Sequence, residues 1–257
     1  MGPERQLVRW RATGPRLARQ VGCALISLAA AQWAAAGSFG VAPIRVELRD
    51  AHRIESVTVR NQSDAPLLLQ ARAVAWSQDA GEERTVDTHE LLVTPLIVQI
   101  APHGEQVLRV ALRRDADPSR ELDYRLLFTE VAPADDAESQ QGQGLRVALQ
   151  LSVPVFVKPA APVQPQLRWQ ARTLEDGSVQ VAAANLGTAH AQITGFDLLS
   201  GGDAPLAHAS AIRYVLPGSE MTWNLKPTAS VAADAPLAVQ GQSDGGAFKS
   251  EVDRAGP

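Results

Sequence analysis

One stretch of alternating residues, 145–157, constrains the fold of this chain more than any other feature. Apolar side chains stand at every second position, namely Leu145, Val147, Leu149, Leu151, Val153, Val155 and Val157. An extended strand places such a set on one face, whereas a helix would scatter it around its axis. The run is about twice as long as a usual strand. It therefore predicts an unusually long β-strand with one apolar face.

Shorter runs of the same kind fill most of the remaining chain. The clearest lie at residues 44–48, 56–60, 67–76, 96–100, 106–112, 166–169, 179–184, 191–198, 212–215 and 221–225. Turn residues separate them at intervals typical of a sandwich, and no segment combines a 3.6-residue period with helix caps. We therefore predict an all-β protein made of two immunoglobulin-like β-sandwich domains.

A proline-rich segment, residues 159–165 (PAAPVQP), is the best candidate for a boundary between these domains. It separates an N-terminal domain, residues 37–158, from a C-terminal domain, residues 166–257. Because the chain is rich in glycine after Gly241, we expect the end of the second domain to be a frayed tail.

The first 36 residues have the pattern of an export signal. A basic region with five arginines precedes an apolar stretch of small residues, and Ala34-Ala35-Ala36 offers a cleavage site. We predict cleavage after Ala36. The alternative is an anchoring transmembrane helix, but the apolar stretch is shorter than the ~20 residues that a span requires.

Composition excludes several classes of function. The formal charge of −4 and an aromatic content of 5% argue against a nucleic-acid partner, which would favour a basic face. The single cysteine, Cys23, lies inside the export segment, so the exported chain would have no disulfide, no thiol chemistry and no cysteine-ligated zinc.

No catalytic, metal or cofactor motif emerges from the remaining residues. The five histidines, His52, His89, His103, His190 and His208, are dispersed, and we interpret them as separate surface residues. Gly142-Gln143-Gly144 precedes a strand, whereas a dinucleotide site needs its glycines between a strand and a helix. We expect no enzyme activity, no cofactor and no small-molecule substrate.

The long strand has two interpretations. Its apolar face could fill the core of its own domain. Alternatively, the strand lies at an edge and offers that face to another chain, since proteins normally blunt long exposed edges and an unprotected one suggests a partner.

Several segments, in order, resemble the PapD-like periplasmic pilus chaperones over nearly all of the chain after the export signal. Residues 44–48 (IRVEL) resemble the family's first strand with its arginine, and residues 94–110 resemble its proline- and glycine-bearing turn followed by V-R. Residues 124–133 (YRLLFTEVAP) resemble the pattern Y-R-x-x-x-x-E-x-P. Residues 153–159 (VPVFVKP) resemble the end of the family's donor strand.

The resemblance implies a chaperone that works by donor-strand complementation, a form of β-strand addition. The chaperone would fill the open groove of a pilin subunit with alternate side chains and deliver the subunit to an outer-membrane usher. The donated residues would be Leu145, Val147, Leu149 and Leu151, followed by Val153.

The resemblance also implies an anchor for the subunit's C-terminal carboxylate. Arg45 matches the family's arginine, but Pro154 occupies the position of its strand lysine and carries no charge. Arg109 is a candidate replacement, with structural pairing as its alternative role. This departure makes the chain more like the divergent, archaic or spore-coat branch of the family.

The family's interdomain charges have counterparts in Glu121, Lys158 and Asp244, and these would set the angle between the domains. Two other functions stay open at this point: a β-sandwich subunit or adhesin of the pilus itself, and a periplasmic carbohydrate-binding module. The first would usually have one domain with a long N-terminal extension, and the second a cluster of aromatic residues in one cleft.

Overall fold

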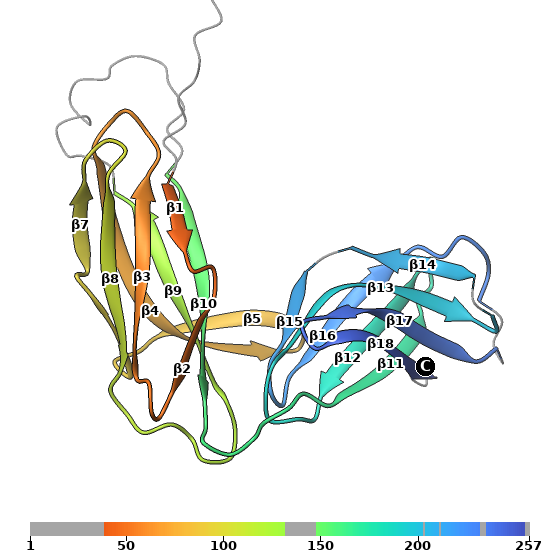
Figure 1. Cartoon of the computed structure of the whole chain (residues 1–257). Coiled ribbons are helices and arrows are strands. Elements are labelled where there is room, and N and C mark those ends of the chain that lie inside the picture. The colour runs from red at the N-terminus through yellow and green to blue at the C-terminus, as the bar shows by residue number, and fades with distance from the viewer. Residues whose placement is uncertain (1–38, 132–147, 203, 211, 232–234, 255–257) are drawn as a thin grey trace, which may run out of the picture. The chain divides into compact units, whose positions relative to one another are not determined.

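Apolar alternation dominates the chain, and strands dominate its structure. The computed structural model describes residues 39–131, 148–202, 204–210, 212–231 and 235–254, which include no helix and therefore no helical membrane span. The expected donor residues Leu145 and Val147, the export segment and Cys23 lie outside these ranges. The strands form two β-sandwiches, so the predicted fold class is confirmed (Figure 1).

The first sandwich consists of two sheets. One has the order β1-β3-β8-β6 and the other β2-β10-β9-β4-β5, with β7 paired to β4. The strands are β1 (Phe39–Ala42), β2 (Val46–Arg49), β3 (Ile54–Asn61), β4 (Leu67–Asp79), β5 (Glu82–Asp87), β6 (Leu91–Thr94), β7 (Ile97–Ile100), β8 (Glu105–Leu112), β9 (Leu122–Glu130) and β10 (Gln150–Lys158).

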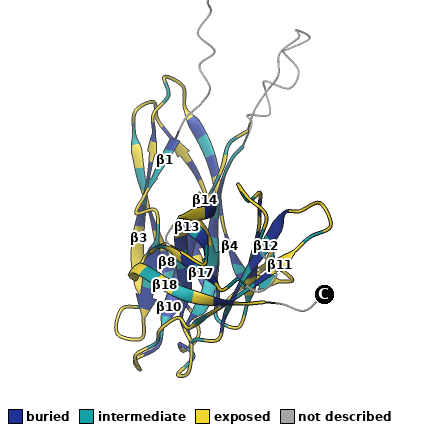
Figure 2. Cartoon of the chain, turned by 90° about the vertical axis from the view of Figure 1, so that its right-hand side faces the viewer, coloured by how far each residue is buried: buried dark blue, intermediate teal, exposed yellow. Residues whose placement is uncertain are grey.

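Alternate residues of both sheets meet in one aliphatic core. On β9, for example, Tyr124, Leu126 and Phe128 are buried while the residues between them are only partly so. The core residues include Val46, Leu48, Val57, Leu69, Leu108, Val155 and Val157, and Figure 2 shows buried positions alternating with exposed ones along several strands. This one-sided burial is what a sandwich of antiparallel sheets requires.

The second sandwich follows a segment without strands, residues 159–166. Its strand order is β14-β13-β17-β18-β11-β12-β16, with β15 paired to β13. The strands are β11 (Leu167–Thr173), β12 (Val179–Asn185), β13 (Ala191–Ser200), β14 (Pro205–Ala209), β15 (Arg213–Val215), β16 (Glu220–Leu225), β17 (Leu237–Ser243) and β18 (Gly246–Arg254). Its core centres on Trp169, whose ring lies 5.1 Å from Phe196 and 5.9 Å from Trp223.

The expected frayed tail after Gly241 is wrong. Residues 237–243 and 246–254 form β17 and β18, which lie between β13 and β11 in the sheet of the second sandwich. The glycines there permit close packing and a tight turn instead of disorder. A Cβ at Gly241 would lie only 2.3 Å from the carbonyl oxygen of Gly195, and Gly246 in the β17–β18 turn has a φ of 107°.

Both sandwiches contain the same buried asparagine turn. Asn61 ends β3 and donates its Nδ2 to the carbonyl of Ala65, four residues on. Asn185 ends β12 and donates its Nδ2 to the carbonyl of Ala189, also four residues on. Each amide closes a local turn and also reaches a neighbouring strand, so it satisfies backbone groups at the end of each sandwich.

Candidate functional site

The long strand of the sequence is present as β10, whose described part begins at Gln150. Residues 148 and 149 precede it without strand assignment, although the carbonyl of Leu149 still accepts a hydrogen bond from the amide of Glu130. Leu149 and Leu151 are partly buried against the margin of the core, while Val153 is buried within it at 4% exposure. The apolar face therefore runs from the interior of its own domain to the margin of that domain.

Backbone pairing along β10 is uneven. On one side the strand pairs with β9 throughout residues 150–157, but on the other side it pairs with β2 only from Val155 to Lys158. Beside residues 150–154, no strand in the described part of the chain completes the second edge. Pro154 lies in this open stretch, where a residue without an N–H disturbs no ladder.

Arg45 lies in a bend immediately before β2, and not within the strand that the sequence suggested. Its Nη1 is 3.3 Å from Oδ2 of Asp244, and its Nε is 3.7 Å from Oε1 of Glu47. Because its side chain is 36% exposed, the guanidinium remains accessible while held between two carboxylates.

Three cations surround Glu47. Lys158 Nζ donates to its Oε2 at 2.9 Å, Arg49 Nη2 lies 3.8 Å from the same oxygen, and Arg45 approaches the other. Burial raises the pKa of Glu47, but the Lys158 hydrogen bond and the three positive charges lower it more, so the net shift is downward. Because Asp244 also lies beside Arg45, three cations share two carboxylates, which leaves these side chains with one net positive charge.

Arg109 does not lie with these cations. It is an exposed residue of β8 in the four-stranded sheet, opposite Ser56 and Thr94, between the buried residues Leu108 and Val110. Its side chain therefore points outward from that sheet. Within the described residues the Arg109 guanidinium makes no ion pair. The cations that accompany Arg45 around Glu47 are instead Lys158 and Arg49.

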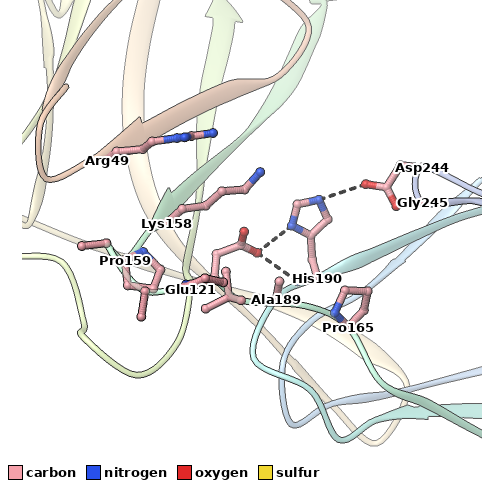
Figure 3. Close-up of a pocket in the computed structure, with 13 residues that line it drawn as sticks. Arg49, Glu121, Lys158, Pro159, Pro165, Ala189, His190, Asp244 and Gly245 are labelled. Atoms are coloured by element: carbon pink, nitrogen blue, oxygen red, sulfur yellow. Dashed lines mark hydrogen bonds and ion pairs between the residues drawn. The ribbon is translucent and has the colours of Figure 1, made fainter.

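Glu121 and Asp244, two of the predicted interdomain residues, come together through His190, which we expected to be a surface residue. His190 is 6% exposed, so its assignment as a surface histidine is wrong. Its Nδ1 lies 2.6 Å from Oε1 of Glu121, and its Nε2 lies 3.4 Å from Oδ2 of Asp244 (Figure 3). Lys158, the third predicted member, pairs with Glu47 instead.

The electrostatics around His190 are those of a buried cation between carboxylates. Burial alone lowers the pKa of His190, but its contacts with Asp244 and Glu121 raise it to about 8. The neighbouring Asp123 is mostly buried beside Glu121, and the burial and the like charge raise its pKa strongly. The side chain of Glu121 is fully buried, and its Oε1 is held by the ring and the backbone amide of His190.

An aromatic cluster lies beside these charges. The ring of Phe156 stacks on His190 with centroids 3.5 Å apart, and Trp76 and Tyr214 pack around the same phenylalanine. Gln78 of the first sandwich bonds both ways to the second: its Nε2 donates to the carbonyl of Tyr214 and its Oε1 accepts from the amide of Leu216. Apolar packing and paired hydrogen bonds thus join the two sandwiches.

A cleft of about 380 Å³ opens between these groups, lined by Arg49, Glu121, Lys158, His190, Asp244 and the linker residues 159–163 and 165. The described residues hold no cluster of potential metal ligands. Arg49 and Lys158 give this lining two cations beside the carboxylates of Glu121 and Asp244, and the linker residues add apolar surface. Of the groups that sequence reasoning missed, Glu47 had a signal, because the alternation of residues 45–49 places Arg45, Glu47 and Arg49 on one face.

A comparison of the sequence with known protein families finds a match over the first sandwich. Residues 38–162 match the family model described as "Pili and flagellar-assembly chaperone, PapD N-terminal domain". Residues 38–162 therefore belong to the PapD N-terminal domain family. This is a family of assembly chaperones and not a class of enzymes. Which branch of it the chain represents stays a prediction.

Individual relatives of this PapD-like chain are distant. It is 32% identical over 88 residues to the chaperone protein FaeE of Escherichia coli, a match that covers 34% of this chain and spans about a third, 31%, of FaeE. A chain of the CsuC–CsuE chaperone–tip adhesion subunit complex from the archaic Csu pili of Acinetobacter baumannii superposes with a TM-score of 0.63 at 18% identity, covering 85% of this chain and 100% of that one. The E. coli chaperone DraB gives a TM-score of 0.55 at 19% identity over 85% of this chain and 97% of its own. These structural matches show the shared two-sandwich fold.

Proposed function

We propose that this protein is a periplasmic chaperone that captures pilin subunits by donor-strand complementation and delivers them to an outer-membrane usher. The observation that carries the proposal is the open edge of β10 along residues 150–154, beside the partly exposed side chains of Leu149 and Leu151. A strand with an apolar face and unpaired backbone groups is what a subunit that lacks a strand would bind. One of the solved structures that this chain resembles contains a chaperone with a tip adhesion subunit, which supports this assignment.

The donated set would be Leu145, Val147, Leu149 and Leu151. At about 25 cal/mol per Å² of apolar surface, a few such side chains contribute several kcal/mol before the costs of association. We leave Val153 out of this set, because its side chain is already buried in the chaperone's own core.

The subunit's C-terminal carboxylate would bind at Arg45. Pro154 occupies the position of the family's strand lysine and carries no charge. Lys158 and Arg49, which share Glu47 with Arg45, are better placed than Arg109 to supply the second positive charge. Guanidinium groups favour this role because they bind a carboxylate with two hydrogen bonds.

The proposal includes an exported protein. Residues 1–36 would be removed as a signal, residues 37–158 and 166–257 would form the two domains, and residues 159–165 would link them. N-terminal sequencing of protein released from the periplasm would begin at Gly37. An intact Met1 on cytosolic protein would contradict export.

Substitution of the anchor tests the proposed function. Arg45→Ala should abolish co-purification with a co-expressed pilin subunit. Its melting temperature should change by no more than a few degrees, because half-exposed ion pairs contribute about 1 kcal/mol or less.

Arg109→Ala is the matched control, since it removes the same charge from an outward-facing site on the other sheet. It should retain normal capture. Undiminished capture by Arg45→Ala would refute the anchor, and loss of capture by a folded Arg109→Ala would assign the second anchor to Arg109 instead.

A further inference from the structure

Both ring nitrogens of His190 face carboxylates. Nδ1 and the backbone amide of His190 both reach Oε1 of Glu121, and Nε2 faces Oδ2 of Asp244. A neutral imidazole has one N–H and one lone pair, so one of these two contacts would become a repulsion between a lone pair and an oxygen. Only the imidazolium is attracted to both carboxylates: Nδ1 donates a hydrogen bond to Glu121, and the positive charge at Nε2 lies 3.4 Å from Asp244 without an aligned hydrogen bond. The stacked ring of Phe156 prevents the imidazole from turning freely.

Asp244 transmits this contact to the proposed anchor. Its Oδ1 accepts a hydrogen bond from the amide of Gln192 at 3.0 Å, which fixes one side of the carboxylate. Its Oδ2 lies 3.4 Å from His190 and 3.3 Å from Arg45, so one oxygen joins the buried histidine to the exposed guanidinium. Loss of the imidazolium charge would leave that oxygen beside a lone pair and favour its rotation away.

We propose that protonated His190 is a positioning residue for subunit capture, because it holds the Asp244 carboxylate that orients Arg45. The inference rests on the proposed function of Arg45 as the anchor. It makes capture depend on pH through a residue that does not contact the subunit's carboxylate itself.

Other charged groups face the same cluster and must be separated from His190. They are Glu121 just before β9, Asp123 within β9, Lys158 at the end of β10, Tyr214 on β15, Arg45 before β2, and Arg120 beside Asp117. Contacts with the two carboxylates raise the pKa of His190 to about 8, against the effect of burial, so the switch would act between neutral and mildly alkaline pH. The pKa of Asp123 is also raised, so the measurements are repeated in Asp123→Asn.

NMR of the purified protein without any subunit gives the first test. The His190 ring signals should titrate with a midpoint near pH 8. The signals of the Arg45 guanidinium, whose Nη1 donates to Asp244, should lose their protection from exchange with the same midpoint. Arg125, whose Nη2 donates to both carboxylate oxygens of Glu83, is the internal control and should stay protected.

Two variants should move or remove this midpoint. Glu121→Gln removes one carboxylate at nearly constant volume and should shift both midpoints down together by about a pH unit. His190→Arg keeps a planar positive charge at all pH values and should leave Arg45 ordered across the whole range. If His190→Arg fails to fold, Glu121→Gln alone decides the question.

Capture of a co-expressed pilin subunit gives the second test. Wild-type capture at pH 9 should fall several-fold below that at pH 7, and Glu121→Gln should show the same fall at lower pH. A His190 midpoint at or below pH 6.5, or an Arg45 signal that ignores that midpoint, would overturn the inference. Because the NMR measurements involve no subunit, they can succeed even where Arg45→Ala disproves the anchor.

Discussion

The two ends of β10 share one alternation of apolar residues but differ in what lies beside them. From Val155 onward, the strand is paired on both sides, by β9 and β2, and its apolar side chains are completely buried. Between Gln150 and Pro154 it is paired only with β9, and Leu151 is partly exposed. One strand is therefore an interior element at its C-terminal end and an edge at its N-terminal end.

This difference shows that the pattern of a strand does not reveal its role by itself. Valines at the C-terminal end face the opposite sheet, and Phe156 on the other face packs against Trp76 and His190. The same alternation continues through Leu151 and Leu149 past the margin of the core. The C-terminal end of the strand would thus serve the fold, and the N-terminal end would bind the subunit. Three measurements test this difference.

The largest expected effect lies at the paired end. Val155→Asp places an unpaired charge at a position with 0% exposure between β9 and β2, and it should destabilise the protein by about 4 kcal/mol or more. Urea unfolding would measure this, with the exposed Gln150→Asp on the same strand as a control that changes stability by about 0.5 kcal/mol or less. A folded, stable Val155→Asp variant would remove the distinction between the two ends.

An intermediate effect is expected from pH at the Phe156–His190 contact. His190 has a folded pKa of about 8 against an ordinary 6.5, so its protonation stabilises the folded state fully below pH 6.5, and this contribution disappears as pH rises through 8. The difference corresponds to about 2 kcal/mol. The raised pKa of Asp123 also makes the folded state less stable as pH rises, because the folded protein holds a proton on this carboxyl that the unfolded chain has already released.

Unfolding free energies at pH 6 and pH 9 would measure this loss in Asp123→Asn, a variant in which the carboxyl at position 123 no longer titrates. His190→Gln in the same background should show no corresponding drop between the two pH values. An equal drop in both proteins would assign the pH dependence to other groups.

Sequence alone gave a good account of the sandwiches because strands with one buried face reveal themselves by a period of two. It failed after Gly241, where glycine content suggested a frayed end. The physical reason is close packing: Gly241 faces the backbone of Gly195, and only tertiary structure reveals that a glycine is required there.

The site was less predictable than the fold. Arg45 was singled out by the resemblance of residues 44–48 to the family's first strand, and the alternation of that run puts Glu47 on the same face. His190 could not be identified as buried, because it follows Ala189 outside any strand, and its burial depends on Phe156, which lies 34 residues earlier in the chain. Partners so distant in sequence leave no local pattern.

The smallest effect on stability, and the most direct test of the account, belongs to Leu149→Glu at the open end of β10. We expect a loss of about 1 kcal/mol or less, because this side chain lies at the margin of the core, together with complete loss of co-purifying pilin subunits, because a carboxylate would enter an apolar groove. A thermal melt and subunit capture would be measured on the same preparation. A near-normal melt with lost capture is the predicted result, whereas a large fall in melting temperature or unchanged capture would contradict the donor role of this strand.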